Sequence, residues 1–409
     1  MKNTSQNSKG FIGGGITAPL GFKGAGVHCG IKKRKLDLAF IFSEVPSQAA
    51  GVFTTNKIAA PPVQLSREKI NKGNFRAIIV NSGNANACTG KKGLEDAKET
   101  ASFTALVLGI KQEEILVSST GIIGRLLPMP QIKIGIGKLI HKLSKNAHRS
   151  IAEAMMTTDT FLKEAAWQTA IGGSRVQIGG AAKGAGMIFP NMATMLCFLT
   201  TDANISRNLL RKALREAVNN SFNSISVDGA QSTNDMVIIL ANGLARNKKI
   251  KKVNKDFLKF QEGLNLVAKI LAQKIVEDGE GATKFVEIAV KGASNDKEAE
   301  KAAWAIAHSN LVKTSLFGAD PNWGRIMAAL GSSGVKLKEE QIDIYYGDCP
   351  VVKKGRAFNV SAARLARLLR NRKIKILVNL GICRGEKKFL TTDLSPDYIR
   401  INAGPKMRK

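Results

Sequence analysis

The sequence has few of the residues that build disulfide-rich domains or metal centres. Its five cysteines are scattered and form no CxxC pair, so neither a disulfide framework nor a zinc site is indicated. They are typical of buried small hydrophobes in a reducing compartment. The four histidines, at positions 28, 141, 148 and 308, have no metal-ligand spacing with one another or with carboxylates. We therefore expect no bound metal.

Long hydrophobic runs are also missing. No apolar stretch approaches the roughly 18 residues of a membrane span. The first ten residues, MKNTSQNSKG, lack the apolar core of a signal peptide. These features predict a soluble, cytoplasmic protein with no membrane partner.

Acidic residues are scarce: 32 Asp and Glu stand against 62 Lys and Arg, a net charge of +30. A charge this large raises the question of a nucleic-acid partner. The lysines, however, are scattered, and aromatic residues make up only 6% with no interleaved stacking platform. We expect no specific nucleic-acid partner, although weak nonspecific RNA binding is compatible with the charge.

Length and periodicity indicate an α/β protein of two domains, or one large α/β body with a smaller lobe. The chain has 409 residues, of which 44% are hydrophobic. Short β-branched runs alternate with helical segments. Strands are predicted at 77–80, 195–200, 236–240, 286–290, 342–346 and 375–380. Helices are predicted at 206–222, 256–277, 299–311 and 362–369, with Ser206, Asp296 and Ser361 as start signals.

The most informative segment is KGAGMIFPNMATML at 183–196. A glycine- and proline-broken stretch carrying one lysine runs into a threonine, Thr194, that opens an apolar strand. A mid-chain hydroxyl is a weak nucleophile. If the Ala193–Thr194 peptide bond is cut, however, the freed α-amine lies on the same residue and can act as its base. On composition alone, Thr194 is also typical of an ordinary strand residue.

This segment resembles the KGxGMIxPNMATML signature of the ornithine acetyltransferase family, also called the bifunctional glutamate N-acetyltransferase family of arginine biosynthesis. The resemblance extends over nearly the whole chain and includes IVNSGNANACTG (79–90), SSTGIIGRLLPM (118–129), MMTTDT (155–160), VDGAQSTNDMV (227–237) and VEDGEGATKFVEI (276–288). It implies a two-domain, self-processing α/β fold with N-terminal-nucleophile chemistry, cleavage between Ala193 and Thr194, and acetyl transfer through Thr194.

The resemblance also implies roles for other residues. Thr120 and Gly121, in the STGIIG motif, match the family's oxyanion hole; without the resemblance this motif is typical of a turn. The substrate contacts implied are Thr157, Lys183, Glu280 and Asn402. A lysine suits a substrate α-carboxylate, and a glutamate suits the cationic amine of ornithine. The C-terminus departs from the family, because Met407 stands where a hydroxyl is expected.

The resemblance thus predicts an enzyme that moves acetyl from N2-acetylornithine to glutamate. We expect an α fragment, 1–193, and a β fragment, 194–409, that stay together as a heterotetramer of two α and two β chains. No tightly bound cofactor is expected; acetyl-CoA is a second acetyl donor in some family members, and no motif here decides its use. Two alternatives stay open: an N-terminal-nucleophile amidohydrolase, and a basic RNA-associated protein on the same scaffold.

Overall fold

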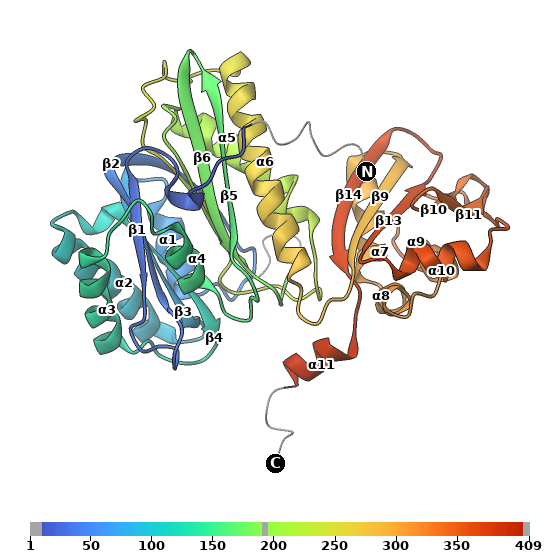
Figure 1. Ribbon diagram of the computed structural model, residues 1–409, viewed down its shortest axis with the longest axis horizontal. Helices are drawn as coiled ribbons and strands as arrows, with labels where there is room; N and C mark the ends of the chain where they lie inside the picture. The colour runs from blue at the N-terminus through green and yellow to red at the C-terminus, as the bar shows by residue number, and fades with distance from the viewer. Residues whose placement is uncertain (1–9, 190–194, 404–409) are drawn as a thin grey trace. The chain divides into compact units, whose positions relative to one another are not determined.

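The computed structural model describes residues 10–189 and 195–403. It divides into two compact units (Figure 1). The first comprises Met1–Gly184, Asn191–Asn223 and Ala230–Ile275, and the second comprises Ala185–Pro190, Ser224–Gly229 and Val276–Lys409. Each unit combines a sheet with helices, which confirms the predicted two-domain α/β class. The 193/194 division separates proposed cleavage fragments rather than structural units, and it stays a prediction.

The first unit is built on an eight-stranded sheet of order β4-β3-β2-β8-β7-β6-β5, with β1 paired to β2. Neighbours β3/β4 and β7/β8 are parallel and the other pairs are antiparallel. Its strands are β1 (Phe22–Val27), β2 (Leu38–Phe53), β3 (Phe75–Asn84), β4 (Ile115–Ile122), β5 (Lys163–Ile171), β6 (Ser174–Lys183), β7 (Leu196–Thr201) and β8 (Met236–Ala241).

Strand β2 organises this sheet because it is long enough to pair twice. Its first half pairs with β1 and β3, and its second half, from Gln48 onward, pairs with β8. Alternate residues of its first half face opposite cores. Ala39 and Ile41 enter one cluster, while Leu38 and Phe40 enter the other, as the period of two in a strand requires.

Helices cover both faces of this sheet (Figure 1). Residues of α4 pack in the core of Ala39 and Ile41, and residues of α2 and α3 pack in the core of Leu38 and Phe40. The helices of the unit are α1 (Pro61–Lys69), α2 (Gly90–Leu108), α3 (Met129–His141), α4 (His148–Met155), α5 (Arg207–Asn219) and α6 (Lys255–Glu277), the last of which runs into the second unit.

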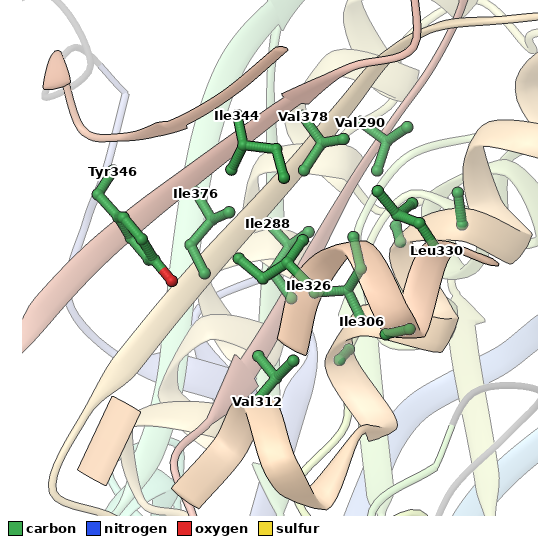
Figure 2. Packing of buried hydrophobic residues seen from close by; sticks show 14 of the residues in the cluster. Ile288, Val290, Ile306, Val312, Ile326, Leu330, Ile344, Tyr346, Ile376 and Val378 are labelled. Carbon is green, nitrogen blue, oxygen red and sulfur yellow. The ribbon is translucent and has the colours of Figure 1, made fainter. Parts of the chain in front are cut away.

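The second unit carries a six-stranded sheet of order β12-β11-β10-β13-β9-β14, in which only the β9/β13 pair among the described strands is parallel. Figure 2 shows strand residues such as Ile288 and Ile376 facing helix residues such as Ile306 and Ile326. Its elements are β9 (Phe285–Ala293), α7 (Asp296–His308), α8 (Asn310–Phe317), α9 (Trp323–Gly331), β10 (Asp343–Tyr346), β11 (Cys349–Lys353), β12 (Arg356–Ala357), α10 (Ala362–Arg370), β13 (Lys373–Asn379), β14 (Gly385–Thr392) and α11 (Pro396–Asn402).

All six predicted strands are present, but one helix boundary is wrong. The predicted helix at 299–311 is two helices, α7 and α8, which meet at Ser309. The side chain of Asn295 caps α7 by accepting from the Glu298 amide, and Ser309 caps α8 by accepting from the Val312 amide. The apolar periodicity continues across the break, so only the capping geometry separates the two helices.

The prediction that every cysteine is buried is also wrong, because Cys88 and Cys383 are exposed. Cys29, Cys197 and Cys349 are buried. Among the described residues, no helix combines the length and apolar character needed to cross a membrane.

Candidate active site

The proposed nucleophile and cleavage residue, Thr194 and Ala193, lie outside the described residues, as does Met407. The structure describes the chain again from Met195, and β7 begins one residue later. In the sheet, Leu196 pairs with Lys183 at the end of β6 and with Met236 at the start of β8. Three strand ends therefore meet beside the residue that follows Thr194.

Thr120 and Gly121 lie near the end of strand β4, where it still pairs with β3, and not in a turn between elements. Thr120 is buried and pairs with Ser82, while Gly121 pairs with Gly83. Gly121 has φ +135°, and a Cβ there would lie 2.3 Å from the carbonyl carbon of Gly83. Only glycine fits this close approach of two backbones. Gly121 is exposed, whereas Thr120 beside it is buried.

A buried amide network holds this strand end. The Asn234 side chain donates to the carbonyl oxygens of Ala85, at 2.6 Å, and Ser119, at 2.8 Å. Asn81 donates to the Asn84 carbonyl at 2.8 Å and accepts from the Ser119 hydroxyl at 2.5 Å. The asparagine-rich segment near residue 81 thus fixes the backbone beside Thr120 through its hydrogen bonds.

Lys183 and Thr157 are brought together by one carboxylate, Asp159. The Lys183 ammonium lies 3.9 Å from Asp159 Oδ2, and the Thr157 amide donates to the same oxygen at 2.9 Å. Asp159 Oδ1 accepts from Lys163 at 2.7 Å and from the Gly184 amide at 2.6 Å. Burial acts to raise the pKa of Asp159, but the two lysines and these hydrogen bonds outweigh it and hold the pKa well below its usual range.

Asp235 connects the start of β7 to β8. Its side chain is 1% exposed, and Oδ1 accepts from the Met195 amide at 2.9 Å. Its neighbour Asn234 holds Ser119, so the two consecutive residues link the Thr120–Gly121 strand end to the residue that follows Thr194. Burial raises the pKa of Asp235 well above its ordinary value, against the lowering effects of the Met195 amide, Ser232 and Lys183.

Two further candidates lie in the second unit. Glu280 occupies the loop between α6 and β9, and its Oε2 accepts from Asn402 Nδ2 at 2.9 Å. The Glu280 amide donates to the Ala185 carbonyl at 2.9 Å. A Cβ on Gly186 would lie 2.4 Å from the Glu280 carboxyl carbon, so the glycine before Met187 leaves room for the carboxylate.

The same unit holds the segment that leads toward the cleavage site. Asp228 accepts from the amides of Met187, at 2.6 Å, and Ile188, at 3.0 Å. The Tyr398 hydroxyl donates to Asp228 at 3.1 Å. Tyr398 lies in α11, which ends at Asn402, so Asp228 ties the 187–188 backbone to the helix that carries Asn402.

Sequence reasoning missed Asp159, Asn234, Asp235 and Asp228 as members of this arrangement. One signal was available: four polar residues, Ser232 to Asp235, directly precede a strand whose every residue is buried. Polar groups at the start of a buried strand need hydrogen-bond partners. Their partners could not be identified from the sequence, because Ala85, Ser119 and Met195 are distant along the chain.

Buried ionisable groups with shifted pKa values, such as Asp159 and Asp235, are a common feature of enzyme active sites. The ArgJ family model matches residues 23–405. The chain is 47% identical over 395 residues to the Arginine biosynthesis bifunctional protein ArgJ of Symbiobacterium thermophilum, covering 96% of this chain and 98% of that protein. It is 46% identical over 395 residues to the protein of the same name from Shouchella clausii, covering 96% of each.

A crystal structure of Arginine biosynthesis bifunctional protein argJ from Bacillus halodurans is 45% identical, with a TM-score of 0.49, and covers 50% of this chain and 96% of that chain. The chain belongs to the ArgJ family. It is therefore an acyltransferase of arginine biosynthesis, of the glutamate N-acetyltransferase class. The family predicted from the signature around Thr194 is confirmed.

Proposed function

We propose that the chain cuts itself between Ala193 and Thr194 and then transfers acetyl from N2-acetylornithine to glutamate through an acetyl-Thr194 intermediate. The observation that carries this proposal is the meeting of strand ends beside Met195. There, Lys183 pairs with Leu196 while Asn234 and Asp235 hold the Thr120–Gly121 backbone and the Met195 amide. This arrangement supports a nucleophile at position 194.

In this proposal Thr194 Oγ attacks the acetyl carbonyl of N2-acetylornithine, and the freed Thr194 amine accepts the hydroxyl proton. Thr120 and the Gly121 amide stabilise the oxyanion. Ornithine leaves with the proton, and glutamate then attacks the acetyl-threonine ester. The close backbone approach at Gly121 supports the oxyanion role, because paired strands hold the backbone at this position in place before the reaction begins.

Lys183 and Thr157, which both lie in the first unit, are proposed to contact the substrate. Both are held by Asp159, which fixes their geometry. Glu280 and Asn402 hydrogen bond to each other. Both are proposed to contact ornithine, with the Glu280 carboxylate binding the cationic side chain. The measurement for these roles is the KM for N2-acetylornithine in Lys183→Met and Glu280→Gln, which we expect to rise in both.

The proposed assembly is a heterotetramer of two α fragments (1–193) and two β fragments (194–409), acting in the cytoplasm without a tightly bound cofactor. The two relatives are named bifunctional, and acetyl-CoA is the second acetyl donor that we propose to test. An assay with acetyl-CoA and glutamate, run without acetylornithine, checks this activity directly.

Intact mass of the purified wild-type chain beside Thr194→Ala tests the proposal first. We expect two wild-type fragments with the junction at Ala193/Thr194, and one uncut chain in the variant. Incubation of the cut enzyme with N2-acetylornithine and glutamate should then yield N-acetylglutamate. If water takes the acetyl group at the same rate with and without glutamate, the amidohydrolase alternative is correct. An uncut wild type that binds RNA in a salt-sensitive way would favour the RNA-associated alternative.

A further inference from the structure

Lys32 is a half-buried cation whose charge is not balanced by an ion pair. Its ammonium donates to the carbonyl oxygens of Leu36, at 2.8 Å, and Met156, at 2.6 Å, and both acceptors are neutral. Within residues 10–189 and 195–403, Lys32 forms no ion pair with a carboxylate. A lysine ammonium can donate three hydrogen bonds, so one hydrogen remains. Because an unbalanced charge is costly to remove from water, this arrangement points to an anionic ligand.

Lys163 shows how a buried lysine is usually balanced. Its ammonium is buried and lies 2.7 Å from Asp159 Oδ1. Asp37 does not do the same for Lys32, although it is only five residues away. The Asp37 oxygens accept from three backbone amides of the segment 29–32, at 2.6–3.1 Å. Asp37 therefore fixes the backbone that carries Lys32 and leaves the Lys32 ammonium for another anion.

The Lys32 side chain lies beside two parts of the proposed site, both in the first unit. Met156, whose carbonyl oxygen it binds, directly precedes Thr157. The aliphatic part of Lys32 packs on Gly83, where an added Cβ would lie 3.0 Å from Lys32 Cγ. Gly83 in turn pairs with Gly121. Lys32 therefore connects the proposed oxyanion strand end with the proposed substrate contact at Thr157.

The charges around Lys32 also favour an anion. Burial is the largest effect and lowers the pKa of Lys32 to about 8, and Lys183 and Lys35 lower it further. Asp37 and Asp159 act in the opposite direction. Lys32 thus keeps its positive charge at neutral pH while it lies in the field of Lys183. Two ammonium groups that repel each other are both stabilised when a negative charge binds beside them.

The two substrates of the transfer carry opposite charges on their side chains. N2-acetylornithine has one carboxylate and a cationic amine, whereas glutamate has two carboxylates. Lys183 is proposed for the α-carboxylate and Glu280 for the ornithine amine, so a further cation is needed for the second carboxylate of glutamate. We infer that the Lys32 ammonium binds the side-chain carboxylate of the glutamate acceptor. This inference rests on the proposed transfer to glutamate and deepens it.

The test measures acceptor selectivity in the full-length wild type, in Lys32→Gln and in the matched control Lys33→Gln, which removes an exposed charge from the next residue. Lys32→Gln retains N–H donors but loses the charge. With N2-acetylornithine as donor, glutamate is compared with glutamine, which lacks only the side-chain charge. We expect kcat/KM for glutamate to fall about 10- to 100-fold in Lys32→Gln, with little change for glutamine. Lys33→Gln should match the wild type.

The donor half of the cycle separates a substrate contact from a structural role. In a two-step transfer, kcat/KM for N2-acetylornithine reports only the first acetyl transfer, which involves no glutamate. Lys32→Gln should therefore leave this constant near its wild-type value. An equal fall in the constants for donor and acceptor would mean that Lys32 only holds the Met156 segment, and it would overturn the inference.

The outcomes separate this inference from the proposed function. A wild type that transfers no acetyl from N2-acetylornithine to glutamate removes the proposed function itself. An active wild type beside a folded Lys32→Gln with unchanged preference for glutamate removes only the role of Lys32. If thermal melts show that Lys32→Gln does not fold, labelling of wild-type lysines with an amine-reactive ester decides. N-acetylglutamate, but not N-acetylglutamine, should protect Lys32, as measured by peptide mass; equal labelling with both overturns the inference.

Discussion

At the scale of single residues, backbone room and charge pairing decide what the centre can contain. Gly121 lies where β4 and β3 come so close that a methyl group would contact the Gly83 carbonyl carbon. The Asp159 carboxylate forms ion pairs with two buried lysines, Lys163 and Lys183. Both residues shape the site before any substrate binds. We predict the effect of one substitution at each.

Gly121→Ala should lower the acetyl-transfer rate by about 100-fold or more, because the shifted backbone moves the proposed oxyanion donor. Gly124→Ala is the matched control: Gly124 also has a positive φ, +82°, but nothing lies within 4 Å of its added Cβ. Steady-state assays of both variants check this. Equal loss in the two would mean that backbone strain, not the contact with Gly83, is responsible.

Asp159→Asn should lower the free energy of unfolding by about 3–5 kcal/mol, because it removes the negative charge that lies beside two buried lysines. Since the Asp159 pKa lies below its ordinary value, the stabilisation is complete above the unfolded pKa of about 3.9 and is lost only as pH falls through the lower folded value. Denaturant unfolding at pH 7 measures the loss. Asp348→Asn, which removes an exposed pair with Arg364, should leave the unfolding midpoint unchanged.

At the scale of elements, buried hydrogen bonds help to hold helices against sheets. In the second unit, Lys313 of α8 is 3% exposed and donates to the hydroxyls of Thr391, at 3.1 Å, and Thr392, at 3.2 Å, in β14. Burial lowers the pKa of Lys313 to about 8, with Asp393 and Asp228 acting in the opposite direction. The Lys313 ammonium therefore titrates in an accessible pH range.

A buried lysine with a lowered pKa makes the folded state bind fewer protons than the unfolded state between the two pKa values. Stability due to Lys313 should therefore rise as pH increases from about 8 toward the ordinary lysine value of about 10.4. Unfolding measured at intervals from pH 7 to 10 checks this in the wild type and in Lys313→Met. The rise should be smaller in the variant; an identical pH dependence would contradict the assignment.

At the scale of the whole molecule, the proposed fragments share one sheet. Strand β6 belongs to residues 1–193, and its partner β7 belongs to residues 194–409. The same holds for the antiparallel neighbours β2 and β8. Cutting at 193/194 leaves these backbone hydrogen bonds and the apolar core around Phe198 and Ile238 in place. Fragment separation would expose both.

The cut protein should therefore elute as one species containing both fragments, at low salt and in 1 M salt, because burial of apolar surface is not screened by ions. Size-exclusion chromatography with light scattering, followed by a denaturing gel of the peak, measures this. The fragments should separate only in denaturant. Two separate peaks in salt would contradict a shared core and the proposed heterotetramer together.

The sequence predicted the fold class and the short buried strands because β-branched runs bounded by turn residues carry their signal locally. It located the 236–240 strand and the Ser206-led helix, now β8 and α5. It could not predict the two-fold use of β2 or the break at Ser309, since these depend on pairing and on cap geometry. Likewise, Thr120 and Gly121 were identified through resemblance, whereas their strand context comes from pairing with β3.

The sequence by itself determined the family, the candidate nucleophile Thr194 and the residue types of the proposed substrate contacts, because an unbroken motif is a local property of the chain. Tertiary structure alone decided which groups meet. Asp159 holds Lys183 across a gap in sequence, and Asp235 reaches Met195 only because β7 and β8 are parallel neighbours. Proton positions and charge pairing depend on distances of a few ångströms, which folding sets and residue order does not express.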